Sequence, residues 1–177
     1  MKHHREFEIA FVGLKPGEHT FHYQITDKFF EQADKPEFHD ALIDVKLILD
    51  KKQGTFLLKF DINGKVQIPC DRCGDEYEML LWDEFELLVK VIDDDEVARK
   101  SEDDAEVAYI GRSESILDVS GYIYEFIILS IPIQHIHPDR EDGSSGCNPA
   151  VIEFLKKQEV EQRQQVWKNL PDIKNEN

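Results

Sequence analysis

Residues 41–69 read ALIDVKLILDKKQGTFLLKFDINGKVQIP, and this stretch decides the fold class. Between Ala41 and Leu49 every second residue is apolar, so one face of this segment is suited to a hydrophobic core. Residues 51–54 form a short turn signal, and residues 55–62 are again rich in apolar and β-branched side chains. The pattern therefore predicts two antiparallel strands joined by a hairpin.

The dipeptide Asn63-Gly64 follows the second of these strands. It is the short sequence most typical of a type I′ hairpin turn, because Asn and Gly tolerate the positive φ angles that both central residues adopt. We therefore predict a turn at residues 63–64 and a third strand over residues 65–69. Three strands joined by tight turns form an antiparallel meander.

Alternating segments on both sides of this meander predict more strands, which would form an antiparallel sheet or a partly closed barrel. Residues 76–92 indicate two strands or one long bent strand, although helical spacing is an alternative there. Aromatic and β-branched side chains toward the end of that segment favour strand. The remaining expected elements are strands over residues 5–12, 19–25 and 107–110 and a short helix over residues 27–34.

The second half of the chain predicts two helices. Apolar residues recur at helical spacing over residues 113–131, and Pro132 ends the pattern. Asn148-Pro149 is a helix-start signal, a cap residue followed by proline, and predicts a second helix over residues 151–169. The fold class is therefore α+β. We expect one α+β domain over residues 1–147, with an acidic loop at 93–106, and a C-terminal helix with a frayed tail over residues 148–177.

Length and charge narrow the class of protein. The chain has 177 residues, of which 41% are hydrophobic, so a sizeable core can be buried. Its net charge of −16 disfavours nonspecific binding to a phosphate backbone. Such acidity suits a basic protein partner or simply keeps the protein soluble. Because no apolar run is long enough for a bilayer and no signal-peptide pattern begins the chain, we expect a cytoplasmic protein.

The three cysteines carry the sharpest local signal. Their odd number argues against a disulfide framework. Cys70 and Cys73 are separated by two residues at the end of a predicted strand, a spacing that lets two thiolates bind one tetrahedral zinc ion. Cys147, with His135 or His137, could complete four ligands and close a structural site. Reduced thiols without metal and a redox-active Cys70/Cys73 pair are the alternatives.

Apart from these cysteines, no motif indicates catalysis. The chain lacks a Gly-x-Ser-x-Gly elbow, a glycine-rich phosphate loop and a His-Glu-x-x-His pattern, so we predict that it is not an enzyme. A metal-dependent hydrolase or nuclease is the enzymatic alternative. Arg72 stands between the two cysteines and either pairs with a neighbouring carboxylate or contacts a partner.

Residues 66–78, VQIPCDRCGDEYE, resemble the Cys-x-Arg-Cys signature of the YceD family. Residues 116–132 are similar to that family's Asp-Leu…Glu-x-Ile-x-Leu-x-x-Pro helix, and His137 and Cys147 fall where relatives place a His and a Cys. The order and distances of these motifs agree with the family, and together with the N-terminal strands the resemblance covers most of residues 1–155.

This resemblance implies a non-enzymatic role in the accumulation of large-subunit ribosomal RNA. It also implies a partner in the pre-ribosomal particle, either pre-ribosomal RNA or a large-subunit ribosomal protein such as a small zinc-ribbon protein. Zinc is the candidate cofactor, with Cys70, Cys73, His137 and Cys147 as its ligands, and reduced thiols without metal are the alternative, since relatives carry further cysteines where this chain has only Cys147. Arg72 and Glu125 are the implied contacts to RNA or protein. The family's functional positions correspond here to Cys70, Arg72, Cys73, Asp118, Glu125, Pro132, His137 and Cys147.

Overall fold

The computed structural model of the chain describes residues 5–31, 36–93 and 107–168. Of the predicted acidic loop at 93–106, only Asp93 falls within this part. In chain order the elements are η1 (Arg5–Phe7), β1 (Glu8–Ile9), η2 (Phe11–Gly13), β2 (Gly17–Ile25), α1 (Asp27–Phe30), β3 (His39–Lys52), β4 (Thr55–Pro69), β5 (Glu76–Ile92), β6 (Val107–Gly111), β7 (Leu117–Asp118), α3 (Ser120–Leu129) and α4 (Pro149–Lys168).

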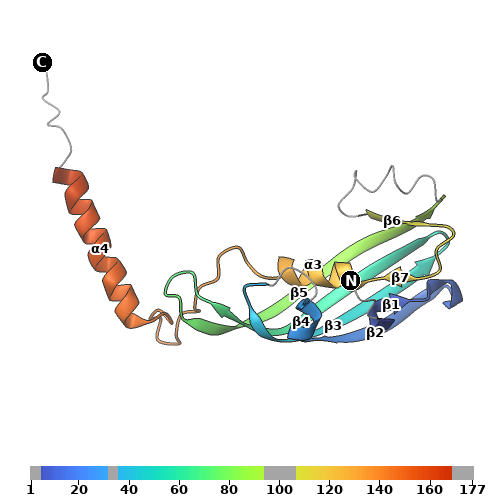
Figure 1. Cartoon of the computed structure of the whole chain (residues 1–177), viewed down its shortest axis with the longest axis horizontal. Coiled ribbons are helices and arrows are strands. Elements are labelled where there is room, and N and C mark those ends of the chain that lie inside the picture. Colours follow the sequence, from blue (N-terminus) through green and yellow to red (C-terminus); the bar gives the residue numbers. More distant parts are fainter. Residues whose placement is uncertain (1–4, 32–35, 94–106, 169–177) are drawn as a thin grey trace, which may run out of the picture. The chain divides into compact units, whose positions relative to one another are not determined.

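Five strands form one open sheet in the order β2-β3-β4-β5-β6 (Figure 1). The pairs β2–β3 and β3–β4 are antiparallel, as the alternating segments predict. The last strand, β6, runs parallel to β5 and makes the sheet mixed, which the local pattern did not indicate. The α+β class is confirmed, and the sheet ends at β2 and β6 without closing into a barrel.

The core lies on one face of this sheet because side chains alternate along every central strand. Leu47 and Phe60 are opposite each other in the register of β3 and β4, and both are fully buried. Helix α3 covers this face, since Ile123 and Ile127 are fully buried and the Phe126 ring lies 4.9 Å from the Phe60 ring. Each such buried side chain contributes about 1.5–3 kcal/mol relative to an exposed one.

Helix α3 is shorter than predicted. The expected helix spans residues 113–131, whereas α3 begins at Ser120, because Leu117 and Asp118 pair with β1 as strand β7. The Asp118 side chain accepts a hydrogen bond from the backbone N–H of Ser120 at 2.9 Å and so stabilises the start of the helix. Strand pairing and this side-chain contact together set the N-terminal boundary.

The predicted turn at Asn63-Gly64 is wrong. Strand β4 runs without interruption from Thr55 to Pro69, and buried residues continue in the same alternation on both sides of Gly64, at Ile62 and Val66. A Cβ atom at Gly64 would lie 2.4 Å from the Leu42 carbonyl oxygen. The glycine therefore serves the close approach of β3 and β4, and burial of the apolar face outweighs the local turn preference.

The chain divides into two compact units. One comprises Met1–Ile68 and Glu78–Ile133, and the other comprises Pro69–Tyr77 and Gln134–Asn177. The second unit contains α4, whose start follows the predicted signal: the Asn148 side-chain oxygen accepts a hydrogen bond from the Ala150 N–H at 3.1 Å. None of the described helices combines the length and apolarity needed to cross a membrane.

Candidate metal centre

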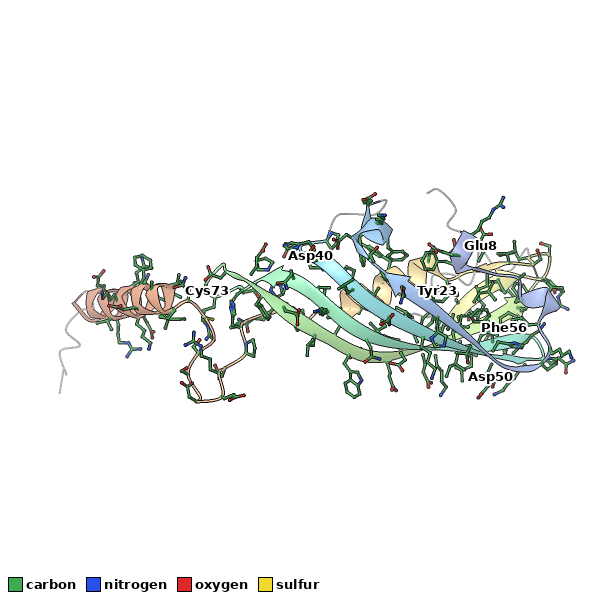
Figure 2. All side chains as sticks on the ribbon, turned by 90° about the horizontal axis from the view of Figure 1, so that it is seen from below. Glu8, Tyr23, Asp40, Asp50, Phe56 and Cys73 are labelled. Carbon is green, nitrogen blue, oxygen red and sulfur yellow. The ribbon has the colours of Figure 1, made fainter. Side chains whose placement is uncertain are left out.

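The first half of the candidate site is the tight turn that follows β4 and contains Cys70 and Cys73 (Figure 2). The backbone N–H of Gly74 donates to the Cys70 carbonyl at 2.8 Å, and the Cys70 N–H donates to the Asp75 carbonyl at 2.9 Å. Gly74 has a φ of 77°, which glycine adopts without the steric cost that a Cβ atom imposes. These bonds hold the two cysteines in one rigid turn.

Hydrogen bonds between His135 and Asp71 hold the loop that carries His137, the second half of the candidate site, against this turn. The Asp71 N–H donates to the His135 carbonyl at 2.9 Å, and the His135 N–H donates to the Asp71 carboxylate at 2.8 Å. The buried imidazole of His135 also donates from Nδ1 to the Pro69 carbonyl at 2.9 Å, which assigns the proton to that nitrogen. His135 therefore anchors the loop, and His137 enters the site two residues later.

Gly146 brings the last cysteine to the cluster. A Cβ atom at this position would lie 2.2 Å from the Pro138 carbonyl oxygen and 3.2 Å from the His137 Cβ, so only glycine allows the two loop segments to approach this closely. Cys147 comes next and is buried. Its neighbour Asn148 donates from its side chain to the Asp75 carboxylate at 3.0 Å, which links this segment back to the cysteine turn.

The four predicted ligands meet at one point. Ligand atoms of Cys70, Cys73, His137 and Cys147 all lie within 4.8 Å of one another. The Cys70 and Cys147 sulfurs are 3.7 Å apart, and the Cys73 sulfur lies 3.5 Å from His137 Nδ1. Zinc bonds of about 2.3 Å to sulfur and about 2.0 Å to nitrogen, at a tetrahedral angle, place such pairs about 3.8 and about 3.5 Å apart. These two distances fit ligands of one tetrahedral ion, and 3.7 Å is far longer than a disulfide bond of about 2.05 Å.

The surroundings of the cluster favour a thiolate at its centre. Burial alone raises the pKa of the Cys70 thiol, but hydrogen bonds from His137 and from the backbone of Cys73 and Arg72 lower that pKa to about 6. For Cys147, burial raises the pKa, and the neighbouring Cys70 thiolate raises it further. A cation among the three sulfurs would relieve this repulsion and stabilise all of them as thiolates.

A tyrosine ring covers the imidazole side of the cluster. The Tyr77 ring lies 4.6 Å from the His137 ring, centroid to centroid, at an angle of 32°. Burial raises the pKa of the Tyr77 hydroxyl, and the charges of Cys70, Asp71 and Cys147 raise it further. Both effects favour the neutral hydroxyl of Tyr77.

The donor set indicates a structural site. Three cysteines and one histidine are the ligands that structural zinc sites use, and together they fill all four positions of a tetrahedron. No position is left for the water or substrate that a catalytic zinc ion binds. An ion held here would cross-link residues 70–73 to residues 137–147 within the same unit.

The two predicted contact residues lie in different units. Arg72 is exposed in the cysteine turn. Glu125 is exposed on α3, in the unit that contains the sheet. Neither position by itself indicates what it contacts, so the role of both residues stays a prediction.

Two residues that build the site were not singled out from the sequence, Asp71 and Gly146. Asp71 holds His135, the alternative histidine ligand, which lies outside the four-residue cluster, and Gly146 permits the close approach of the loop. Both adjoin predicted ligands, because Asp71 follows Cys70 and Gly146 precedes Cys147. A glycine immediately before a candidate ligand was the available signal, since glycine often marks a close backbone approach.

Comparison with known proteins assigns the family. A family model described as "Large ribosomal RNA subunit accumulation protein YceD" matches residues 58–174, a segment that contains both halves of the four-ligand cluster. A search of curated proteins and a search of solved structures each return no match. Because the matched segment is well over half of the chain, this protein belongs to the YceD family.

Proposed function

We propose that this protein is a non-enzymatic, cytoplasmic accessory factor of large-ribosomal-subunit assembly that promotes accumulation of large-subunit ribosomal RNA. The observation that carries the proposal is the family match over residues 58–174. The expected partner is a large-subunit ribosomal protein or pre-ribosomal RNA within an assembling particle. Arg72 and Glu125 are the proposed contact residues.

Within this proposal, zinc bound by Cys70, Cys73, His137 and Cys147 has a structural role. It would hold the cysteine turn and the 137–147 loop in a fixed arrangement, and so present Arg72 in a defined place. Ordering a binding surface before the partner arrives reduces the entropy lost on association. The zinc site would therefore support binding of the partner and would not convert a substrate.

A metal-dependent hydrolase fits the geometry less well. Hydrolysis at zinc requires an open coordination position for water, whereas the four protein ligands present here would occupy all positions. A thiol redox function also fits less well, because Cys70 is buried and its sulfur lies beside that of Cys147, with Cys73 beside His137. Thiol exchange requires an accessible sulfur.

The test is complementation of a strain that lacks the gene. We expect the wild-type chain to restore the ratio of large-subunit to small-subunit ribosomal RNA, and to sediment with particles that precede the mature large subunit. The His137→Gln variant, which removes one ligand, should restore neither. His22→Gln is the matched control, because His22 is an exposed histidine on β2 and is not one of the four cluster residues or their neighbours in the sequence.

Two outcomes would contradict the proposal. The first is a normal ratio of the two ribosomal RNAs in the strain without the gene. The second is a wild-type chain that stays at the top of the gradient under conditions in which the ratio is restored. Rescue by Arg72→Ala at wild-type level would remove Arg72 from the contact surface while leaving the assembly role in place.

A further inference from the structure

Strand β5 has one long edge that no described strand covers. On one side β5 neighbours β4, and on the other it pairs with β6 only from Leu88 to Ile92. Figure 1 shows β6 running beside one end of β5 only. Among the described residues, positions 78–87 therefore present unpaired backbone N–H and C=O groups along one edge. Such an edge is a template for another extended chain.

Two large apolar side chains stand beside this edge. Leu80 and Trp82 are each 75% exposed, and both lie on the sheet face opposite the core, since the intervening Leu81 is buried. Soluble proteins usually blunt an exposed edge with lysine, proline or a bulge. The segment 78–89 has neither lysine nor proline, its charged residues are all acidic, and it offers a tryptophan, one of the residues enriched at binding hot spots.

The charged residues on the β5 segment that carries Trp82 are all acidic. Segment 78–89 contains Glu78, Asp83, Glu84 and Glu86 but no lysine or arginine. Glu78 and Glu86 are paired with Lys65 and Lys59 of β4, at 2.8 and 2.7 Å. Asp83 and Glu84 have no ion pair with the described residues, so the chain segment next to Trp82 keeps its negative charge.

We propose that the β5 edge, residues 78–87, binds an extended segment rich in lysine and arginine from a partner protein, which adds to the sheet as a further strand. Backbone hydrogen bonds to the edge supply affinity in this mode, and alternate side chains supply specificity. Lysine or arginine side chains on the Trp82 face would pair with Glu84 and lie over the face of Trp82 as cation–π contacts, and Asp83, on the other face of the strand, adds to the negative charge of the edge.

The negative charges of Asp83 and Glu84 disfavour two other molecules that could occupy the β5 edge, a second copy of this chain and a single-stranded RNA. A second copy paired edge to edge would bring Asp83 and Glu84 of one chain close to the same carboxylates of the other, and like charges across paired strands are destabilising. A single-stranded RNA could stack on Trp82, but its phosphates would face carboxylates where such sites normally present lysine and arginine. The proposal about the β5 edge rests on its geometry and charges and does not depend on the proposed function. A basic ribosomal protein as the partner would agree with both proposals.

The probe is a synthetic peptide of about ten residues with alternating lysine and valine, a length typical of one strand. Binding is read from the emission of Trp82 in a Trp167→Phe background, which leaves Trp82 as the single tryptophan. We expect a blue shift on binding, and an affinity that falls about tenfold or more between about 50 and about 200 mM salt. A peptide with glutamate in place of each lysine should not bind.

Two further peptides test the backbone pairing directly. They carry N-methyl groups at alternate residues, one set at odd positions and the other at even positions, so composition and charge are unchanged. Only one set of N–H groups faces β5 in a paired strand. We therefore expect one methylated peptide to lose affinity about tenfold or more and the other to bind nearly as well as the parent.

Protein variants supply the matched controls. Glu84→Lys should weaken binding of the basic peptide about tenfold, whereas Asp139→Lys, the same charge change at an exposed residue of the other unit, should leave it nearly unchanged. Equal binding of both methylated peptides, no binding of the basic peptide, or tighter binding of a single-stranded RNA of similar length would overturn the proposal. So would a dimer in the free protein that Trp82→Ala dissolves.

Discussion

Gly146 and the carbonyl of Pro138 are in such close contact that a Cβ atom at position 146 would lie 2.2 Å from the Pro138 oxygen. This contact places Cys147 next to the histidine and the two other cysteines of the candidate metal centre. The obstructing atom belongs to the backbone, which cannot rotate away as a side chain would. The geometry of the cluster thus depends on residue 146 having a hydrogen atom where any other residue has a Cβ atom.

We therefore expect Gly146→Ala to weaken zinc binding and to destabilise the protein by about 1–3 kcal/mol, the usual cost of forcing a methyl group into a packed site. Zinc affinity from competition with a chelator, and urea unfolding, measure the two effects. Gly121→Ala is the matched control, because no atom lies within 4 Å of a Cβ at this helical position. It should be neutral or stabilise α3 by up to about 1 kcal/mol. Equal effects of the two substitutions would contradict the proposed role of Gly146.

The cysteine and histidine ligands should act as one unit. Protein purified without a metal-affinity tag is expected to contain zinc at one ion per chain, and Cys70→Ser and Cys147→Ser should each remove it, because a tetrahedral structural site needs all four ligands. Elemental analysis gives the stoichiometry, and His137→Gln compared with His22→Gln tests the histidine. Wild-type protein without zinc, and with an unchanged melting temperature in both cysteine variants, would leave the cysteines as ordinary thiols.

Gly64 provides a test of the continuous strand β4. A Cβ atom at this position would lie 2.4 Å from the Leu42 oxygen and 2.6 Å from the Ile43 Cα, so Gly64→Ala must push β3 and β4 apart. We expect a loss of about 1–3 kcal/mol in the free energy of unfolding, measured by urea titration. Gly13→Ala, where nothing lies within 4 Å of the added Cβ, should change stability little. A hairpin turn at residues 63–64 would instead give Gly64→Ala the modest cost of a turn position.

The Tyr23 side chain is buried on β2 (Figure 2), and we expect it to make stability depend on pH in the alkaline range. Burial raises the pKa of its hydroxyl from 10.0 to about 12, and this hydroxyl has no hydrogen-bond partner among the described residues. Below pH 10 both the folded and the unfolded chain keep the proton, so the full stability is present. Between pH 10 and 12 the unfolded chain ionises first, and wild-type stability should fall by about 2–3 kcal/mol.

Tyr23→Phe isolates this contribution. Removing an unsatisfied buried hydroxyl should leave stability at pH 7 unchanged or raise it by about 1 kcal/mol, and the advantage over wild type should grow above pH 10. Urea unfolding at several pH values, with phenolate absorbance to follow tyrosine ionisation, makes the comparison. An advantage that stays constant up to pH 12 would mean that the Tyr23 hydroxyl is solvated in the folded protein.

Much of the sheet was readable from the sequence because side-chain alternation is a local property. The strands around Val45, Phe60 and Val89 follow directly from a period of two residues. The turn predicted at Asn63-Gly64 was wrong for the same reason, because the turn preference of this dipeptide is also a local property and takes no account of strand pairing. Only the pairing of β4 with β3 over its whole length shows that burial of Ile62, Val66 and Ile68 on one face overrides it.

By itself, the sequence determined the α+β class, the strongly acidic surface, the cysteine turn at 70–73 and, through the resemblance of its motifs, the family. The tertiary structure alone decided that Cys147 and His137 reach that turn, that β6 runs parallel to β5, and that β6 pairs with β5 only from Leu88 to Ile92, so that no described strand pairs with the same edge at residues 78–87. The physical reason is that a local pattern fixes which face of a segment is apolar. Which distant segments then meet depends on shared backbone hydrogen bonds and on close approaches such as Gly146 to Pro138, and these exist only once the chain has folded.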